Sequence, residues 1–467
     1  MGQSTFPSPQ RMKHFRTHHT DCCHTNSGRP TDGNQDPFLL LRRFHLCSAP
    51  NLCGYFLLLL HLCVSPLRAE IRVSTDFEGG SAKVEAIDQA ARVIRFMPGG
   101  DPQRGWACWW YVRVDGVAKG EKITLDLAGS DRPTRNNGKD TTQPLAASWA
   151  MPARATFSTD GKAWQHTAPG KKEGARIAYE VTGTGGPLWV AWGPPFTPRD
   201  TDALLVEAEK LSPAAKAFEL ARTRGGRPVR GLRVSEATAP KPPGIWVHAR
   251  QHAWESGSCW VARGFTEWLV SDDAEAKWLR SHAEIFIVPI MDVDNAATGN
   301  GGKEAAPRDH NRDWDDNPVY PEVAAAQQRL RALAKEDRLA VFLDLHNPGP
   351  GDPTFFFVLE PQFLKEPMFA QCQRFVEFAY ARISEIKPLI PMSNRPKTTG
   401  PSYHPLWRNM SASWVSMNGN PDSVSLCLET IWNYENSTTA GYSAVGRELG
   451  RATADFVRTR PVSEKRD

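Results

Sequence analysis

The sequence predicts an α/β protein with a mixed sheet flanked by helices, preceded by a small all-β sandwich domain. Between residues 70 and 200, short segments rich in Val, Ile, Trp and Tyr are separated by turn-forming clusters. After residue 200, apolar strands alternate with helical patterns, which is typical of a sheet covered on both faces. We therefore expect three parts: a leader over residues 1–69, the β-sandwich over 70–200 and the α/β domain over 201–460.

The leader has the pattern of a secretory signal peptide. Arg42 and Arg43 precede an apolar run over residues 54–64, and Ala69 follows as a small residue at the exit. The run is too short to span a bilayer, so no stable membrane span is expected. The prediction is export to the periplasm or the medium, and a chain without a functional signal would remain cytoplasmic. The alternative, a disordered or misassigned extension, applies to residues 1–40.

Composition and charge favour a soluble globular protein without a nucleic-acid partner. Apolar residues make up 40% of the chain and charged residues 23%. The formal net charge of +4 arises in the leader, which holds seven Lys or Arg against three Asp. No basic stripe with interleaved aromatics follows. The four cysteines after the leader (Cys108, Cys259, Cys372 and Cys427) show no metal-ligand spacing, so neither a disulfide framework nor a cysteine metal site is expected. Cys259 and Cys427 lie in apolar segments, where a buried thiol is expected.

The elements of both domains follow from these patterns. In the sandwich we expect antiparallel strands; they cover about residues 91–96, 109–114, 122–127 and 188–192. The sixteen tryptophans are interpreted as packing residues. In the second domain we expect alternating helices and strands; the helices cover about residues 202–221, 256–270, 320–335 and 366–386, and the strands 229–235, 245–248, 285–289, 339–344 and 423–428. The ligand site of such a sheet lies beyond the strand ends.

Three residues at predicted strand ends have the chemistry of a metal centre. His252 and Glu255 follow one strand and open a helix, where side chains three apart share a face. His346 ends another strand. Two His and one Glu with an open fourth position form the ligand set of a catalytic zinc ion. Each fragment alone is a weak signal, because a His at a strand end is usually a loop residue.

Further polar residues lie beside the predicted metal ligands. Glu429 ends an apolar strand, where an unpaired carboxylate is costly, so it is interpreted as the general base beside zinc rather than as a salt-bridged core residue. Asn311 and Arg312 fit a clamp for a substrate carboxylate, although such a loop pair is often solvated. Asp309 is a candidate partner for a zinc-binding histidine.

The chain also resembles the zinc carboxypeptidase family, and in particular a bacterial-type member of its cytosolic-carboxypeptidase branch, which includes deglutamylases. The resemblance rests on residues 249–264, 288–294 and 311–314 and on the strand segment 226–235. The branch also carries a β-sandwich before its catalytic domain. The similarity covers about residues 75–455 and excludes the leader.

The resemblance implies a zinc-dependent metallocarboxypeptidase that hydrolyses C-terminal residues of peptides or proteins. It implies one zinc ion held by His252, Glu255 and His346, with Glu429 as general base and acid. Asn311 and Arg312 would hold the terminal carboxylate of the substrate.

Two positions depart from the family pattern, and one further role is assigned between two candidates. Where the family has an arginine that polarises the scissile carbonyl, this chain has Gly302 and Lys303, and a lysine lacks the bidentate fork. His346 is followed by Asn-Pro-Gly in place of the family's frequent Gly-His-Ser. The tyrosine that closes over the substrate is assigned to Tyr403, which lies in a predicted loop, rather than to Tyr380 in a predicted helix.

Two alternatives and one question of specificity remain open. A zinc deacylase of small N-acyl amino acids shares the same fold and ligands, and a non-catalytic peptide-binding relative would keep the pocket. Some members of the branch trim acidic residues, and basic side chains at Arg395, Lys397 and Arg408 would suit an acidic terminus.

Overall fold

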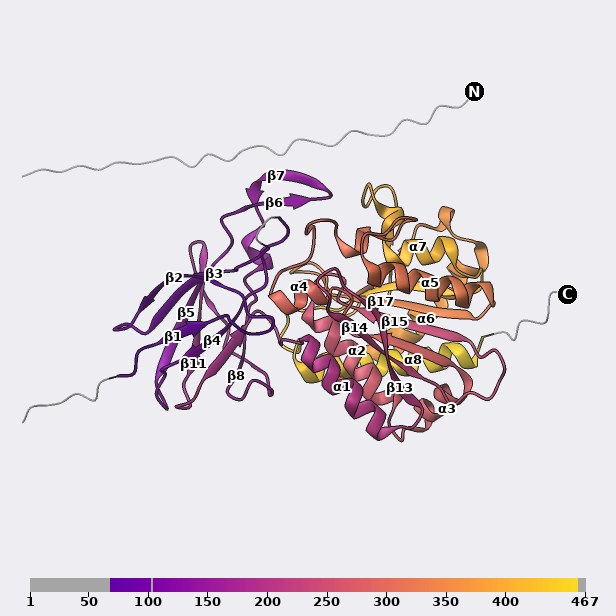
Figure 1. Cartoon of the computed structure of the whole chain (residues 1–467), viewed down its shortest axis with the longest axis horizontal. Helices are drawn as coiled ribbons and strands as arrows, with labels where there is room; N and C mark the ends of the chain where they lie inside the picture. The colour runs from indigo at the N-terminus through magenta and orange to yellow at the C-terminus, as the bar shows by residue number, and fades with distance from the viewer. Residues whose placement is uncertain (1–67, 102–103, 461–467) are drawn as a thin grey trace, which may run out of the picture. The chain divides into compact units, whose positions relative to one another are not determined.

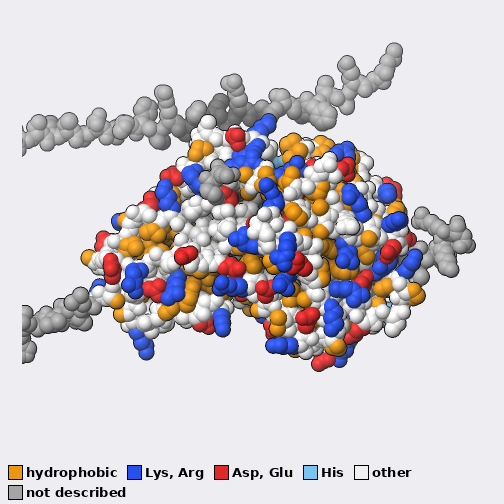
Figure 2. Space-filling view, viewed as in Figure 1, with side chains coloured by type: hydrophobic (Ala, Val, Ile, Leu, Met, Phe, Trp, Pro, Cys, Tyr) orange, Lys and Arg blue, Asp and Glu red, His pale blue; other side chains and the backbone are white. Residues whose placement is uncertain are grey.

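The structure, a computed structural model, describes residues 68–101 and 104–460. The predicted signal peptide lies outside these residues. Within them, none of the helices is both long enough and apolar enough to cross a membrane. On the face drawn in Figure 2, basic and acidic side chains are interspersed.

The N-terminal part of the described chain contains two five-stranded sheets and a short hairpin (Figure 1). One sheet, in spatial order, consists of β1 (Arg72–Ser74), β4 (Tyr111–Asp115), β12 (Leu188–Ala191), β8 (Thr156–Ser158) and β9 (Gln165–His166). The other consists of β10 (Lys171–Glu173), β11 (Arg176–Thr182), β5 (Lys122–Ala128), β3 (Val93–Met97) and β2 (Lys83–Asp88), and β6 (Pro133–Asn136) pairs with β7 (Lys139–Pro144). The prediction of a β-sandwich is confirmed. The prediction that it is wholly antiparallel is wrong, because β3 and β5 pair in parallel.

A mixed eight-stranded sheet carries the second half of the chain. Its spatial order is β13 (Ala215–Arg222), β14 (Pro228–Val234), β16 (Glu284–Val288), β15 (Gly244–Ala249), β17 (Leu339–His346), β20 (Val424–Glu429), β18 (Phe355–Leu359) and β19 (Lys397–Thr399). The four central strands are parallel to one another, and antiparallel pairs lie towards both edges. Every residue of β15 and β17 is buried, as expected for strands covered on both faces.

Helices cover both faces of this sheet. One apolar cluster joins the sheet to α2 (Ser256–Leu269), α3 (Ala274–His282), α6 (Glu366–Ile383) and α8 (Thr439–Arg458). A second cluster joins the opposite face to α4 (Val293–Thr298), α5 (Pro321–Lys335) and α7 (Ser411–Asn418). Figure 1 shows α5 and α7 on one side of the strands and α2 and α8 on the other. Short 3-10 turns complete the chain: η1 (Ala147–Trp149), η2 (His310–Arg312), η3 (Pro361–Phe363) and η4 (Trp407–Asn409).

One predicted helix is wrong over half its length. The helix expected over residues 202–221 is α1 (Pro198–Leu211), and the residues after it form the edge strand β13. Pro213 explains the break, because a proline disfavours helical geometry in the residue before it. Here Ser212 is extended and ends the helix. The helices predicted over residues 256–270, 320–335 and 366–386 are present with slightly shorter ends.

A cluster of tryptophans joins the sandwich to the α/β part. Both parts contribute tryptophans to this cluster. Trp106, Trp109, Trp149 and Trp192 belong to the sandwich, and Trp254 and Trp432 belong to the α/β part. Trp192 lies 4.3 Å from Trp432 and 5.3 Å from Trp254 between ring centroids. Residues 68–460 fall in one compact unit, so the domain boundary at residue 200 stays a prediction.

Candidate active site and metal centre

The metal centre lies at the carboxyl ends of the central parallel strands. His346 is the last residue of β17, and in the strand register it pairs with Glu429, the last residue of β20. His252 and Glu255 lie in the turn after β15, closed by a hydrogen bond from Glu255 N to His252 O of 3.1 Å. The prediction that this pair lies on a helix is wrong, because α2 begins only at Ser256. The turn nevertheless brings both side chains to one point.

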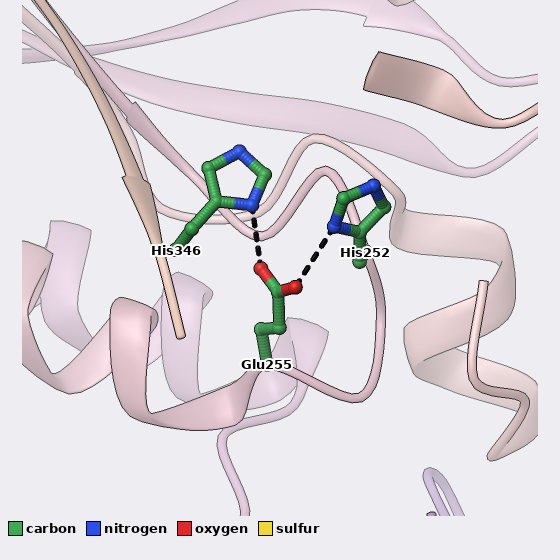
Figure 3. A group of neighbouring side chains, drawn as sticks. All are labelled: His252, Glu255 and His346. Atoms are coloured by element: carbon green, nitrogen blue, oxygen red, sulfur yellow. Dashed lines mark hydrogen bonds and ion pairs between the residues drawn. The ribbon is translucent and has the colours of Figure 1, made fainter. Parts of the chain in front are cut away.

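Three buried side chains converge there (Figure 3). His252 Nδ1 is 2.8 Å from Glu255 Oε1, and His346 Nδ1 is 2.6 Å from Glu255 Oε2. Their ligand atoms all lie within 4.8 Å of one another. Each side chain is at most 3% exposed.

The far sides of both imidazole rings contact carboxylates. His252 Nε2 is 3.1 Å from Asp309 Oδ1, and His346 Nε2 is 2.9 Å from Asp344 Oδ2. An Nε2–H that donates to a carboxylate leaves the Nδ1 lone pair for a metal, which is the usual outer partner of a zinc-binding histidine. In that tautomer two lone pairs and a carboxylate face one another, and a cation is the group that satisfies all three. The residues therefore fit a zinc ion.

The charges of the buried side chains at this centre also favour a bound cation. Burial opposes ionisation of Glu255, but His252 and His346 lower the pKa of its carboxyl to about 2. Burial likewise opposes ionisation of Asp309 and Asp344, and the neighbouring histidines hold the pKa of both carboxyls below the ordinary value. The two ligand histidines are shared among three buried carboxylates, and buried negative charge is costly without a cation. A bound dication offsets it.

Asp344 belongs to a polar network that the sequence analysis left without a role. Its Oδ1 lies 3.0 Å from His248 Nε2, and Gln251 donates to its Oδ2 over 2.6 Å. Ser411 also donates to this carboxylate. The signal in the sequence was the spacing of Asp344 and His346, because side chains two apart on a strand point to the same face. Gln251 had no such signal.

A cavity of about 400 Å³ opens beside the ligands. Its walls include Glu429, Lys303, Arg312, Tyr403 and Trp149, together with His252 and Glu255. The structure thus brings four of the five predicted catalytic and substrate-binding residues to one cavity. Asn311 lies behind His346 instead, with its Nδ2 3.2 Å from the ring Nε2 and its Oδ1 accepting from Ser411 N.

Glu429 has the electrostatic properties of a proton acceptor that works near neutrality. Burial, reinforced by the negative charge of Glu255, raises the pKa of its carboxyl to about 7. Among the described residues none donates a hydrogen bond to Glu429 Oε2. Cys427 Sγ approaches Oε1 at 3.8 Å. A carboxylate with an available oxygen beside a metal centre can take a proton from water.

Arg312 and Tyr403 lie at the outer part of the cavity. Arg312 is 7% exposed, its Nη1 donates to Asn311 O over 2.7 Å, and its Nε is 3.3 Å from the ring of His404. Burial and the Arg312 charge lower the pKa of His404 to about 4, so this ring is neutral at pH 7. His404 was missed in the sequence. Tyr403 is 41% exposed and packs 5.0 Å from Phe357.

Of the three basic residues considered for an acidic substrate, Lys397 alone lines this cavity. Its ammonium is paired with Asp352 at 2.9 Å. Arg408 stacks on Trp407, 4.3 Å from the ring centroid, and Arg395 is exposed. Of these three basic side chains, only that of Lys397 is therefore placed to meet an acidic terminus in this cavity.

Comparisons with known proteins relate part of the chain to zinc carboxypeptidases. Residues 202–338 match the family model described as zinc carboxypeptidase. The sequence is 32% identical over 118 residues to mouse cytosolic carboxypeptidase 1, covering 25% of this chain and 10% of the relative. An uncharacterised protein of Zymomonas mobilis is 25% identical over 246 residues, or 52% of this chain and 59% of the relative. The match to curated cytosolic carboxypeptidases spans only about a tenth of their length.

Solved structures with the same fold cover most of the chain. A metallo-carboxypeptidase from Burkholderia cenocepacia aligns with a TM-score of 0.69 at 22% identity, covering 83% of this chain and 99% of that one. A metallo-carboxypeptidase from Pseudomonas aeruginosa, solved in complex with (2-guanidinoethylmercapto)succinic acid, aligns with a TM-score of 0.65 at 23% identity, covering 83% and 100%. Residues 202–338 thus match the zinc carboxypeptidase family, and most of the chain has the fold of the solved metallo-carboxypeptidases. Over about a quarter of its length the chain is similar to curated cytosolic carboxypeptidases.

Proposed function

We propose that the protein is a zinc-dependent metallocarboxypeptidase that removes C-terminal residues from peptides. The observation that carries the proposal is the cavity in which the ligand pair His252 and Glu255 lies beside Glu429, Lys303 and Arg312. One cavity then offers ligands for a metal, a base for water, and cationic groups for the terminal carboxylate and the scissile carbonyl of a substrate. The family match and the metallo-carboxypeptidase fold support the same activity.

Each side chain has a role that follows from its chemistry. A bound zinc ion supplies Lewis acidity and lowers the pKa of water. Glu429 accepts the proton of the attacking water and delivers it to the leaving amine. Arg312 binds the terminal carboxylate, because its guanidinium presents a planar pair of donors. Lys303 donates to the carbonyl oxygen as negative charge develops there. Tyr403, a partly exposed residue of the cavity wall, covers the bound terminus.

The proposal extends to an acidic preference at the substrate terminus. Lys397 is the observation in its favour, since it lies in the cavity wall and its pair with Asp352 is half-exposed. To bind an acidic side chain of the substrate, Lys397 would have to give up its carboxylate partner Asp352 for the new one. The preference is therefore expected to be modest.

The decisive experiment compares peptides with a free and with an amidated C-terminus, with release of the terminal residue measured by mass spectrometry. Zinc-dependent release from the free peptide alone is expected, because Arg312 requires a carboxylate. Turnover of N-acyl amino acids in place of peptides would instead identify the deacylase. Peptide binding without release in the zinc-loaded protein would identify a non-catalytic relative. Glu429→Gln provides the matched inactive control.

We also propose that the protein is exported. The basic and apolar pattern of residues 42–69 supports this proposal. Cell fractionation and N-terminal sequencing of the mature protein test it. Recovery of an uncleaved chain in the cytoplasm would contradict it.

A further inference from the structure

The loop that carries Lys303 lies directly against the N-terminal sandwich. Trp106 N donates to Lys303 O over 3.0 Å. Gly301 approaches Trp106 so closely that a Cβ at this position would lie 2.1 Å from Trp106 O. On the other side Trp254 N donates to Gly301 O over 2.9 Å. The backbone before Lys303 is thus held between a sandwich residue and the turn that bears the metal ligands.

Other sandwich residues hold the rest of this loop. Arg104 donates to Pro307 O over 2.6 Å and to Ala305 O over 3.1 Å. The backbone N–H of Gly138, at the tip of the β6–β7 hairpin, donates to Glu304 over 3.0 Å. Contacts from two separate sandwich segments therefore meet one short stretch of the α/β part.

The Lys303 side chain contacts the sandwich through an aromatic ring. Its Nζ lies 5.2 Å from the centroid of the Trp106 ring, within the range of a cation–π contact. Within residues 68–101 and 104–460, no group accepts a hydrogen bond from this ammonium and no carboxylate pairs with it at 4.0 Å or less. A ring face attracts the charge without using an N–H donor. All three donors therefore stay available to a substrate oxygen.

The Trp106 ring is itself held in place. Its Nε1 donates to Arg135 O over 2.9 Å. The ring of Trp149, which also lines the catalytic cavity, packs edge-on against it at 4.6 Å. Trp106 is only 8% exposed. A lysine stem is long and flexible, so a fixed ring is what limits the positions of its ammonium.

We propose that Trp106 of the N-terminal sandwich is a positioning residue that holds the Lys303 ammonium in the catalytic cavity. The proposal rests on the proposed function, in which Lys303 stabilises developing charge on the substrate carbonyl. It assigns the sandwich a direct part in catalysis, because the residue that orients the cation comes from a different part of the chain. An arginine, with its rigid fork, would depend less on such a support.

A double-mutant cycle between Trp106 and Lys303 tests this inference. Trp106→Leu keeps an apolar side chain but removes the ring, and we expect kcat to fall roughly 3- to 30-fold with KM little changed. Trp106→Phe keeps an aromatic face and is expected to restore most of kcat. In a Lys303→Ala background, Trp106→Leu is expected to lower kcat by less than about twofold, because the group it positions is gone.

Trp189→Leu is the matched control. Trp189 also lies in the sandwich and also contacts a cation, Arg113, at 5.6 Å from the ring centroid, but it does not line the catalytic cavity. Its loss is expected to leave kcat unchanged. Zinc content and the thermal unfolding midpoint are measured for every variant, and Trp106→Met replaces the leucine variant if that variant does not fold.

Two results would overturn the inference. If Lys303→Ala lowers kcat but Trp106→Leu lowers it by the same factor in both backgrounds, the indole is merely structural and the role of Lys303 stands. If Lys303→Ala leaves kcat unchanged, both the role of Lys303 and the positioning by Trp106 are wrong. Coupling between the two residues, with zinc content unchanged, supports the inference.

Discussion

Replacing Glu429 by glutamine is expected to lower the turnover of the protein and to raise its free energy of unfolding. The change keeps the size of the side chain and removes its negative charge. If Glu429 is the general base, turnover should fall at least ~10²–10⁴-fold, while zinc content and peptide binding are retained. Initial rates on a peptide, metal analysis and calorimetric binding measure the three quantities.

Without metal, the Glu429→Gln variant should have a higher free energy of unfolding than the unchanged protein. Burial raises the pKa of Glu429 from 4.5 to about 7, which corresponds to a cost of about 3 kcal/mol when the carboxylate is ionised. Because the side chain keeps some contact with water in the cavity, we expect about 1–3 kcal/mol. Between these pH values the folded chain keeps a proton that the unfolded chain has released, so stability falls as pH rises. The cost is complete above pH 7 and absent below pH 4.5.

Chemical denaturation of the chelated protein at pH 4.5 and pH 8 measures this effect. The unfolding free energy of the Glu429→Gln variant should be higher than that of the unchanged protein at pH 8 and equal to it at pH 4.5. Glu435→Gln, which alters an exposed carboxylate in the following loop, should change neither stability nor turnover. A Glu429→Gln variant with near-normal turnover would place the base elsewhere, and a stability difference independent of pH would refute the electrostatic argument.

Three further predictions concern the metal and the substrate. His346→Ala should abolish both zinc retention and peptidase activity, and full zinc occupancy in this variant, measured by metal analysis, would remove the proposed site. Asp344→Asn should weaken zinc binding by about 10- to 100-fold in a chelator competition, because the His346 ring loses the carboxylate that orients it. Peptides ending in Glu should be cleaved up to about tenfold faster than otherwise identical peptides ending in Leu, with the advantage reduced by salt and by Lys397→Met. Equal rates for both termini would exclude the acidic preference and leave the carboxypeptidase assignment intact.

Much of the fold could be predicted from local patterns. The apolar runs that became β15, β16, β17 and β20 were identified because strands covered on both faces have few polar residues. The edge strand β13 was missed, since half of its residues are exposed and its composition suits a helix. The longest helix, α8, was not identified either. The parallel pairing of β3 with β5 depends on contacts distant in sequence, which no local period reveals.

The sequence by itself determined which residues can serve the chemistry. His252, Glu255, His346 and Glu429 were found because together, each beside a predicted strand end, they supply the ligands of a catalytic zinc ion and a base. Arg312 followed from the suitability of guanidinium for a carboxylate. These inferences needed only residue type, local spacing and a known family pattern.

Only the tertiary structure decided how these groups are held. The contact between Glu255 and His346 joins residues 91 apart, and it depends on the register of the parallel strands β15 and β17. The structure alone placed Asn311 behind a ligand, Lys397 in the cavity wall and Trp106 under the Lys303 ammonium. Such contacts join segments distant in sequence, and they depend on the packing of whole surfaces rather than on the periodicity of any one segment.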